Sequence, residues 1–379
     1  MRRKSFTFPV STLVGSNLSN IRAIFRSHKP ELRYYPKVAL TLMGVCILEV
    51  LMLWERLRWG RKILAYRMEK PPVFIIGFWR SGTTLLHNLL CHDPDASYTT
   101  TLQTVFPHLT LSQKWWIRPL INLFLPALRP FDNVSMDTDY PQEEEYGLVN
   151  VQSCSLYNFF QFPGDFDSIV EHEITPEKTG PGMEDEWMKQ YSLLIAKAGI
   201  NTGGIRYISK NPCNLARVKL LKKMFPEAKF IFIYRNPYKV VESLYRFYLA
   251  IVPGVKLQDM PPDYNREKIV KLYVTMMTYF QAEKSLVSPS DLIEIKMEDF
   301  MRDKFGYLER IYRLFGMNTF SQARIRMEDY LKENDGYSRE PYVIHPETFA
   351  LVNRYASHIV KELGYPVQTV TDAETVSFG

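Results

Sequence analysis

The clearest pattern along the chain is a fully apolar stretch that runs directly into an amphipathic one. In the segment PPVFIIGFWRSGTTLLHNLL, residues 71–90, the part PVFIIGF is apolar throughout, which is typical of a strand buried on both faces of a sheet. The apolar residues of the following TTLLHNLLCHDP recur at helical spacing until Asp93 and Pro94, which predict the end of the helix. Residues 71–94 therefore predict a strand, a glycine-containing turn and a helix.

The same alternation of strand and helix patterns returns in the second half of the chain. Strands are predicted at RYISKNP, KFIFIYR and DLIEIKMEDF, and helices at LARVKLLKKMF and from about Pro237 onward. Strands that alternate with helices favour a parallel, right-handed arrangement with ligands bound at the carboxyl ends of the strands. We therefore predict an α/β fold with a central parallel sheet flanked by helices.

A different pattern occupies residues 38–62, VALTLMGVCILEVLMLWERLRWGRK. Its apolar run is short for a membrane span and Glu49 interrupts it, after which tryptophans alternate with basic residues. Such a mixture suits a helix packed on the protein's own surface or one attached peripherally to the headgroup region of a bilayer. We favour the packed helix, then interfacial attachment, and last a true span.

These patterns divide the chain into two parts. Residues 1–70 are expected to form an N-terminal helical extension that includes the membrane candidate, and residues 71–379 the main α/β domain. Within this domain, residues 100–200 are rich in Pro, Trp, Tyr and Phe and show irregular helical stretches. We expect an insertion there that lines the pocket of an acceptor substrate.

Composition and charge limit the classes of function that this chain can have. The 379 residues are 46% hydrophobic, 14% aromatic and 23% charged, as in globular chains that bury a large core. The net charge of +6 suits an anionic ligand or a membrane surface, and no nucleic-acid-binding signature accompanies it. The four cysteines lie far apart without metal-ligand spacing, and no secretory signal follows the basic start. We expect free thiols, no bound metal and a cytoplasmic location; no sequence feature indicates an oligomeric state.

The turn GFWRSGTT has the glycine spacing of a nucleotide-phosphate loop. Gly77 and Gly82 allow a sharp turn and a close approach of backbone N–H groups to an oxyanion, and two threonines add hydroxyl donors at a helix N-terminus. The lysine that such a loop normally carries is missing, and Arg80 supplies the cation instead. The strand KFIFIYR ends in Arg235, where a magnesium-supporting acid would be expected. The pattern favours two phosphates bound directly by protein and disfavours a nucleotide kinase.

Two long segments resemble a known family. FIIGFWRSGTTLLHNLLCHDP is similar to the 5′-phosphosulfate loop of the sulfotransferase superfamily, in the branch with R-S-G-T-T, and KNPCNLARVKLLKKMFPEAKFIFIYRNPYKVVESL is similar to its second signature. DYPQEEEYGL, LIEIKMEDFMRD and ELGYP also resemble this branch, so that the resemblance spans residues 71–365. It implies a P-loop nucleotide-kinase-like sulfotransferase fold and 3′-phosphoadenosine 5′-phosphosulfate (PAPS) as the sulfuryl donor, without a metal.

The resemblance also assigns roles to single residues. Arg235 and Ser243 would bind the 3′-phosphate of the donor, and Arg80 and Lys210 would stabilise the charge on the departing phosphate. The 5′-phosphosulfate would be bound by the loop residues Arg80, Ser81, Gly82, Thr83 and Thr84.

At the position of the general base, this chain differs from the related tyrosylprotein branch, in which a glutamate follows the loop. Thr101 stands at that position here and cannot serve as a base. His108 and the acids of PQEEEYGL are the substitutes, and the branch's PQExE pattern favours Glu143, in the first turn of a helix predicted to start at Pro141. The competing interpretation of the three glutamates is a charge cluster at a helix N-terminus. His87, on the helix of the loop, is expected to be a packing histidine.

The aromatic residues of the insertion suggest an apolar acceptor. A sterol or another lipophilic alcohol would suit such a lining, while simple core formation explains the same residues, and a carbohydrate acceptor or a non-catalytic, membrane-attached nucleotide-binding protein remain alternatives. The residues in question are Tyr98, Phe106, Trp115, Trp116, Phe124, Phe131, Tyr157, Phe159, Phe160 and Phe162.

Overall fold

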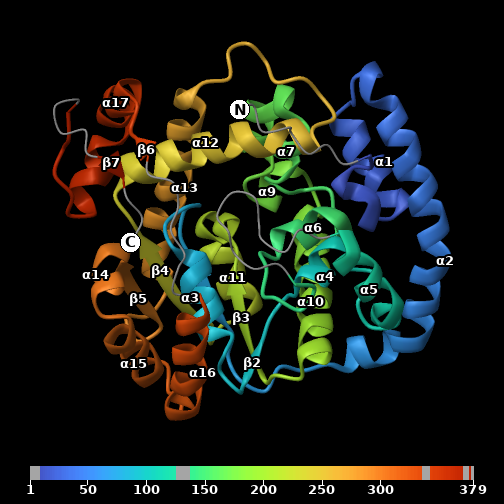
Figure 1. Cartoon of the computed structure of the whole chain (residues 1–379), viewed down its shortest axis with the longest axis horizontal. Coiled ribbons are helices and arrows are strands. Elements are labelled where there is room, and N and C mark those ends of the chain that lie inside the picture. The colour runs from blue at the N-terminus through green and yellow to red at the C-terminus, as the bar shows by residue number, and fades with distance from the viewer. Residues whose placement is uncertain (1–8, 125–136, 335–341, 370–374, 377–379) are drawn as a thin grey trace.

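A computed structural model describes residues 9–124, 137–334, 342–369 and 375–376. Its centre is a parallel five-stranded sheet in the order β2-β3-β1-β4-β5 (Figure 1). The predicted α/β class and the predicted parallel sheet are confirmed. The strands are β1 Val73–Ile76, β2 Ala96–Ser97, β3 Arg206–Lys210, β4 Lys229–Tyr234 and β5 Leu292–Lys296.

Strand β1 occupies the middle of the sheet because it is apolar on both faces. Val73 and Ile75 belong to one buried cluster, and Phe74 and Ile76 to another, so successive side chains serve opposite layers. Ile75 is level with Lys210 of β3 on one side and with Ile231 of β4 on the other. The carboxyl ends of β3, β1 and β4 therefore lie together, where parallel sheets bind ligands.

Helices cover both faces of this sheet. One face is packed by α3 and α14 to α16, and the other by helices that include α10 to α13 and α17. The helices of the first half are α1 Leu18–Ser27, α2 Tyr35–Ala65, α3 Thr83–Leu90, α4 Thr101–Val105, α5 Lys114–Phe124, α6 Glu145–Val151, α7 Asn158–Gln161, α8 Phe166–His172 and α9 Pro176–Thr179. Those of the second half are α10 Met183–Thr202, α11 Val218–Met224, α12 Pro237–Val255, α13 Arg266–Glu283, α14 Met297–Arg302, α15 Lys304–Leu314, α16 Phe320–Glu333 and α17 Pro346–Glu362.

Two pairings were not visible in the sequence pattern. Strand β2 is two residues long and pairs with Arg206 and Tyr207 of β3. The small sheet of β6 Tyr342–Val343 and β7 Thr375–Val376 is antiparallel. Strands this short carry no periodicity that could be recognised before the fold is known.

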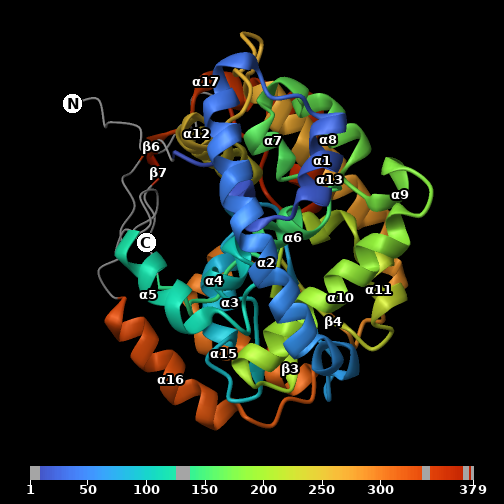
Figure 2. The same cartoon turned by 90° about the vertical axis from the view of Figure 1, so that its right-hand side faces the viewer.

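The expected N-terminal helical segment shares its core with the sheet. Leu13, Ile21, Ile24 and Val45 are buried in the same cluster as Phe74 of β1. Helix α2, which contains the expected helix of residues 38–62, runs along the outside of the molecule (Figures 1 and 2). It packs on the domain along one face and is exposed along the other.

The segment from 100 to 200 contains α4 to α10 and, among its described residues, no named strand. The helix predicted to begin at Pro141 begins instead at Glu145, with Glu144 at the N-cap. Pro141 pairs with Thr100 in an isolated antiparallel bridge, and the amide of Gln142 donates to the carbonyl of Thr99 at 2.9 Å. These extended pairings hold residues 141–142 out of the helix, because a backbone paired across to another segment cannot also adopt helical geometry.

Candidate functional site

The phosphate-type loop lies between β1 and α3, as predicted. A side chain at Gly77 would collide with the backbone oxygen of Ile233 in β4, and Gly82 has a φ of +95° at the N-cap of α3. Gly82 has no side chain to cap the helix, so the first turn of α3 directs backbone N–H groups toward the loop. Thr83 begins the helix and is buried, as is Ser81 in the loop.

Arg80 occupies a strained position in this loop. Its φ of +71° makes it the only non-glycine residue with positive φ in the described part of the chain. Its Nε donates a hydrogen bond to Ser243 Oγ at 2.9 Å, and its guanidinium lies 5.5 Å from the ring centroid of Phe247. Helix α12 therefore leans over the loop, which is the geometry that a shared anion site for Arg80 and Ser243 requires.

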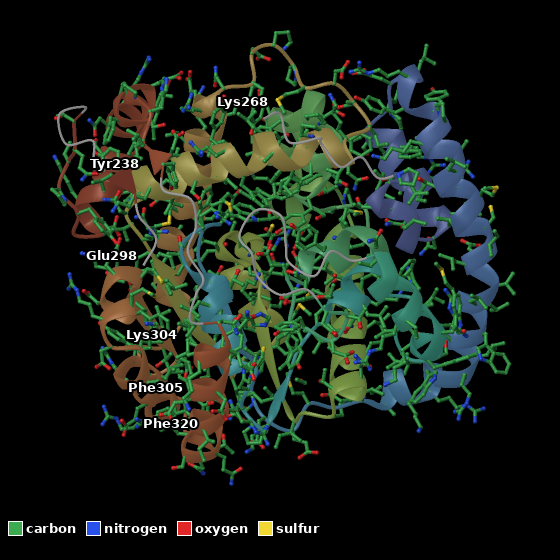
Figure 3. All side chains as sticks on the ribbon, in the orientation of Figure 1. Tyr238, Lys268, Glu298, Lys304, Phe305 and Phe320 are labelled. Atoms are coloured by element: carbon green, nitrogen blue, oxygen red, sulfur yellow. The ribbon has the colours of Figure 1, made fainter. Side chains whose placement is uncertain are left out.

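Arg235 enters the same region from the end of β4. Asn236 caps α12 by accepting from the amide of Tyr238 at 3.0 Å, and Pro237 occupies the first turn, so the chain turns at once from strand into helix. The amide of Asn236 also donates to Glu298 of α14 at 3.4 Å. Tyr238 and Glu298, both labelled in Figure 3, thus lie at the junction that positions Arg235.

Tyr342 of β6 joins this group although no sequence signal placed it there. Its hydroxyl donates to the carbonyl of Lys239 at 3.0 Å. Burial raises the pKa of Tyr342, while a hydrogen bond with Ser243 and the positive charges of Arg235 and Arg80 act in the opposite direction. Arg80 therefore contacts Ser243, and the permanent positive charges of Arg80 and of Arg235, which follows β4, both act on Tyr342.

Lys210 and Glu143 form an ion pair in the same half of the sheet. Their Nζ and Oε1 atoms are 2.6 Å apart, and the side chains are 1% and 12% exposed. Lys210 ends β3 beside β1, and Glu143 lies just before α6. A cation and a carboxylate at this position can stabilise a departing anion and accept a proton, respectively.

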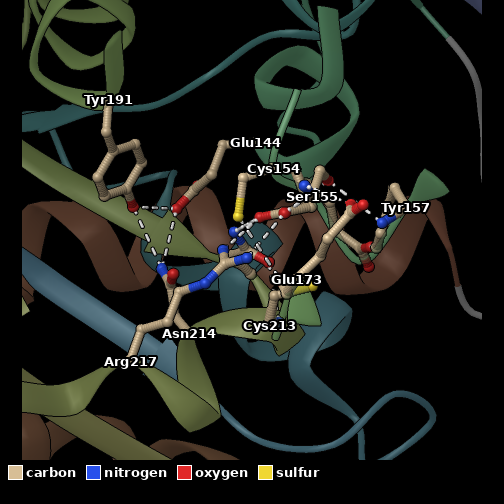
Figure 4. Close-up of polar contacts among 12 residues, drawn as sticks. Glu144, Cys154, Ser155, Tyr157, Glu173, Tyr191, Cys213, Asn214 and Arg217 are labelled. Carbon is tan, nitrogen blue, oxygen red and sulfur yellow. Dashed lines mark hydrogen bonds and ion pairs between the residues drawn. The ribbon is translucent and has the colours of Figure 1, made fainter. Parts of the chain in front are cut away.

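The two glutamates that follow Glu143 have structural environments of their own. Glu144 accepts from the hydroxyls of Tyr191 and Tyr207 at 2.5 and 3.2 Å, and from Ser209. Figure 4 shows the contact between Glu144 and Tyr191. Burial raises the pKa of Glu144, and these hydrogen bonds oppose the shift. Glu144 lies at the N-cap of α6, as the alternative of a charge cluster at a helix N-terminus expects, and its side chain is buried.

Glu145 pairs with Arg217, and both side chains are fully buried. Two guanidinium nitrogens donate to the carboxylate at 2.8 and 3.2 Å, and Asn211 Nδ2 donates at 2.6 Å. Since Asn211 follows Lys210, and Glu144 accepts from the Lys210 amide at 3.3 Å, the buried glutamates hold the end of β3 in place. By fixing the end of β3, Glu144 and Glu145 align their neighbour Glu143 with Lys210.

Tyr157 and Trp79 complete the site, and the contact between them was not predicted from the sequence. The indole Nε1 of Trp79 donates to the Tyr157 hydroxyl at 3.1 Å, and this hydroxyl donates to Glu143 Oε2. Burial raises the pKa of Tyr157, and the charge of Glu143 adds to the shift. A chain of hydrogen bonds thus runs from the loop through Tyr157 and Glu143 to Lys210. Both aromatic residues stand out in the sequence, but their contact is visible only in three dimensions.

The two candidate histidines lie in other environments. His108 Nε2 is 3.3 Å from both Asn17 Nδ2 and the carbonyl of Asn150. Burial lowers the pKa of His108 to about 3, and the charge of Lys197 acts in the same direction. The expectation that His108 could act as the base is not supported by these contacts, which place it against the N-terminal segment.

His87 lies behind the loop. It contacts the carbonyl of Ile208 at 3.2 Å, and burial lowers its pKa to about 3, with the charge of Lys210 contributing. His87 therefore packs as a neutral histidine between α3 and β3, as expected.

The aromatic residues of the insertion divide into two groups. Phe159 and Phe162 are buried in the main core, whereas Trp115 is 76% exposed, and the side chains of Phe124 and Phe131 lie outside the described residues. Core formation therefore explains part of this set.

Phe160 and Tyr157 are buried in the same core cluster, and with the partly buried Phe247 they form an aromatic wall beside Arg80. Phe160 contacts Phe247 edge to face at 6.3 Å between centroids, and Tyr157 contacts Phe160 at 5.3 Å. Because Phe247 also lies beside Arg80 and Tyr157 contacts Glu143, this wall adjoins both halves of the site.

Among the described residues, no group of three or more His, Cys, Asp or Glu side chains is placed to hold a metal ion. Cationic side chains at the site are those of Arg80, Lys210 and Arg235.

Known proteins are similar to this chain in sequence or in fold. Stf3, an omega-hydroxy-beta-dihydromenaquinone-9 sulfotransferase of Mycobacterium bovis, is 29% identical over 361 residues, which cover 94% of this chain and 92% of that protein. The solved structure of sulfotransferase STF1 from Mycobacterium tuberculosis has a TM-score of 0.61 at 16% identity, covering 90% of this chain and 91% of that one. STF9 from Mycobacterium avium gives 0.59 at 17%, covering 86% and 87%.

The family model of the sulfotransferases matches residues 71–322. This range contains the loop with Arg80, the strand-end cations Lys210 and Arg235, and the carboxylate of Glu143. The chain that builds this site belongs to the sulfotransferase family and is a sulfotransferase.

Proposed function

We propose that this sulfotransferase uses PAPS as its donor and a lipophilic alcohol as its acceptor. The observation that carries the proposal is the convergence of Arg80, Ser243 and Arg235 at the carboxyl ends of β1 and β4. Two anionic groups of one nucleotide need two sets of hydrogen-bond donors from the protein. The loop with the N-terminus of α3 supplies one set, and Arg235 with Ser243 supplies the other.

The residues of the site fit such a donor. The loop can hold the 5′-phosphosulfate through Ser81, Thr83, Thr84 and the backbone at Gly82, where a side chain would collide with Met297. Arg80 lies between the two anion sites and can contact the phosphosulfate while Ser243 and Arg235 contact the 3′-phosphate. The donor supplies an activated sulfuryl group; everything else that the reaction needs comes from side chains of this protein.

Glu143 is the proposed general base. Its carboxylate accepts the proton of the acceptor hydroxyl as the hydroxyl oxygen bonds to sulfur and the bond from sulfur to the phosphate oxygen breaks. Arg80 and Lys210 neutralise the charge that develops on that phosphate oxygen. Tyr157, which donates to Glu143, and Lys210, which pairs with it at 2.6 Å, orient the carboxylate before the reaction.

Two observations support a lipophilic acceptor. The aromatic wall beside Arg80 is apolar, and its partly exposed member is Phe247, since Phe160 and Tyr157 are buried behind it in the core. An apolar surface at this position favours a hydrophobic acceptor body over a sugar. The relative Stf3 is named for a hydroxylated dihydromenaquinone, which is a lipophilic alcohol. We infer that a sterol, a hydroxylated isoprenoid quinone or a similar lipid alcohol is the acceptor. A cytoplasmic location is supported by the four cysteines, all of which are free.

The acceptor class is tested by competition with a labelled donor. A sterol, a hydroxylated isoprenoid quinone, a simple phenol, an oligosaccharide and a tyrosine peptide are offered together in detergent, and labelled products are separated. Labelling chiefly of the sterol or the quinone is expected, whereas labelling chiefly of the oligosaccharide would show a carbohydrate O-sulfotransferase. Release of adenosine 3′,5′-bisphosphate is followed in parallel. Stabilisation by this nucleotide without turnover of any acceptor would show a binding protein.

A further inference from the structure

Helix α2 presents a continuous apolar stripe to the outside of the molecule. Large apolar side chains recur along it at intervals of three and four residues from Leu40, which is 44% exposed, to Leu57, which is 73% exposed, and Leu64 follows seven residues later. Exposed apolar patches of this extent mark interaction surfaces. The stripe consists of Leu40, Met43, Ile47, Val50, Leu53, Trp54, Leu57 and Leu64.

The opposite face of α2 is bound to the protein. Glu55 is 1% exposed; it pairs with Lys197 at 2.6 Å and accepts from the amides of Leu111 and Ser112 at 3.0 Å each. The remaining buried residues of this helix are Thr41, Val45, Met52 and Ile63. A helix fixed along one face by a buried ion pair cannot be surrounded by lipid without leaving the domain.

Length and composition alone would permit a membrane span. Within the described residues, Leu32–Ala65 is long and apolar enough to cross a membrane. In its most apolar window, 22% of the residues are buried in the protein. Packing on one side and exposure on the other instead match a helix that lies in the plane of a bilayer surface. Its 31 residues would extend for about 46 Å along that surface.

The charges on α2 indicate which lipids it would meet. Arg56, Arg58, Arg61 and Lys62 are exposed in its C-terminal half, and Arg58 and Lys62 lie 5.5 and 5.0 Å from the ring centroid of Trp59. Of the two acids of this helix, Glu55 is buried, and the half-buried Glu49 accepts from the amide of Leu18 at 2.8 Å. An apolar stripe bordered by cations and aromatic rings complements anionic lipid headgroups over an acyl layer.

We propose that α2 attaches the enzyme to anionic bilayers, with the stripe from Leu40 to Leu64 inserted at the boundary between headgroups and acyl chains. The buried face stays on the domain, and the basic residues contact the headgroups. Attachment of this kind brings the enzyme to the layer in which lipophilic alcohols dissolve. The inference does not depend on the proposed acceptor, because membrane attachment is measured without donor or acceptor.

The first test is flotation of the full chain with vesicles. Vesicles of phosphatidylcholine with phosphatidylglycerol should carry the protein upward in a density gradient, and vesicles of phosphatidylcholine alone should carry less. The triple variant Ile47→Glu/Val50→Glu/Leu57→Glu should lower the bound fraction about tenfold or more, because three apolar contacts become charges. The control Leu286→Glu/Ile325→Glu changes side chains that are 51% and 64% exposed on other elements and should float like the parent.

Light scattering in vesicle-free buffer tests the competing occupant, a second copy of the chain. A dimer that the triple variant converts to a monomer would overturn the proposal, as would a correctly folded triple variant that floats like the parent. A monomeric parent that binds anionic vesicles through the stripe is the expected result. Circular dichroism and the melting temperature verify that each variant is folded.

The second test distinguishes in-plane attachment from a span. Cys46 is the exposed one of the four cysteines and lies near the middle of α2, so it can carry an environment-sensitive fluorophore. Lipids brominated near the headgroup should quench this fluorophore more strongly than lipids brominated near the chain ends. Stronger quenching by the deep bromines would show a span, and no response to either lipid would show that the stripe does not meet the bilayer.

Discussion

At the scale of single residues, three consecutive glutamates have three different surroundings. Glu143 faces Lys210 and Tyr157, Glu144 accepts hydrogen bonds from buried hydroxyls, and Glu145 pairs with Arg217. Chemically identical side chains therefore differ in role because each points to a different element. Only Glu143 combines a position in the site with a neighbouring cation.

Glu143→Gln should lower kcat by about 10²- to 10⁴-fold, the usual loss when a general base is removed. The amide keeps the size of the side chain, so binding of adenosine 3′,5′-bisphosphate should change little. Steady-state kinetics over pH should also show that the acid limb of the rate profile disappears in the variant. His108→Gln serves as the comparison and should keep parental turnover per folded protein. If His108→Gln loses as much kcat as Glu143→Gln, the assignment of the base is wrong.

Tyr157→Phe should lower kcat while leaving KM for the donor nearly unchanged, because the lost hydroxyl orients Glu143 and does not contact the nucleotide in the proposed geometry. The hydrogen bonds that are lost should cost on the order of 1 kcal/mol of unfolding free energy. Tyr248→Phe is a matched control, since the buried Tyr248 hydroxyl donates at 2.7 Å to the carbonyl of Phe159. Both variants should lose similar stability in urea denaturation, but only Tyr157→Phe should lose turnover. Equal turnover in the two would refute the positioning role.

At the scale of elements, the site is assembled by the ends of β1, β3 and β4 together with α12. The parallel register brings Ile75 level with Lys210, and the cap at Asn236 lets the chain enter α12 immediately after Arg235. Ser243 then reaches Arg80 from the second turn of that helix. Each of these placements follows from an element boundary, so a shift of one residue would separate the donors.

Arg235→Ala should weaken binding of adenosine 3′,5′-bisphosphate by on the order of 2 kcal/mol, the scale of a charge-assisted hydrogen bond. Calorimetric titration without added metal measures the effect. Arg324→Ala removes an exposed arginine on α16, which pairs with Glu328, and should bind the nucleotide like the parent. Unchanged affinity in Arg235→Ala would remove this residue from the donor site.

At the scale of the whole molecule, the N-terminal segment is fastened to the domain by buried charges. His28, after α1, lies 2.9 Å from Asp165 and 2.6 Å from Glu173, and its ring stacks on Phe162 at 5.2 Å. Burial opposes charge on His28, but its hydrogen bonds with the two carboxylates and their charges outweigh burial and raise its pKa to about 9. A protonated His28 therefore bridges the N-terminal segment and the helices after residue 157.

This bridge predicts a pH dependence of stability. Because the pKa of His28 rises from 6.5 in the unfolded chain to about 9 in the fold, its contribution is fully present below pH 6.5 and is lost as the pH rises through 9. The contribution should be on the order of 3 kcal/mol at its maximum. Urea denaturation from pH 6 to 10 should show the parent losing its advantage over His28→Asn across this window. A stability difference that does not vary with pH would contradict the bridge.

The sequence by itself determined the parts of the protein that depend on short stretches of chain. The strands at 73–76, 206–210, 229–234 and 292–296 and the start of α12 follow from local apolar runs, glycines and prolines. The loop with Arg80 could be recognised for the same reason, since its glycine spacing lies within one turn. These features depend on neighbouring residues, whose spacing the sequence states directly.

Only the tertiary structure decided which of the candidate residues meet. Glu143 meets Lys210 and Tyr157, His108 lies against Asn17, and the start of α6 moves to Glu145, all through partners far away in the chain. The two faces of α2 could not be told apart in the sequence either, because both are rich in apolar residues and only packing shows which one the domain covers. Contacts between distant segments depend on how helices and strands pack, and a linear pattern of polar and apolar residues does not contain that information.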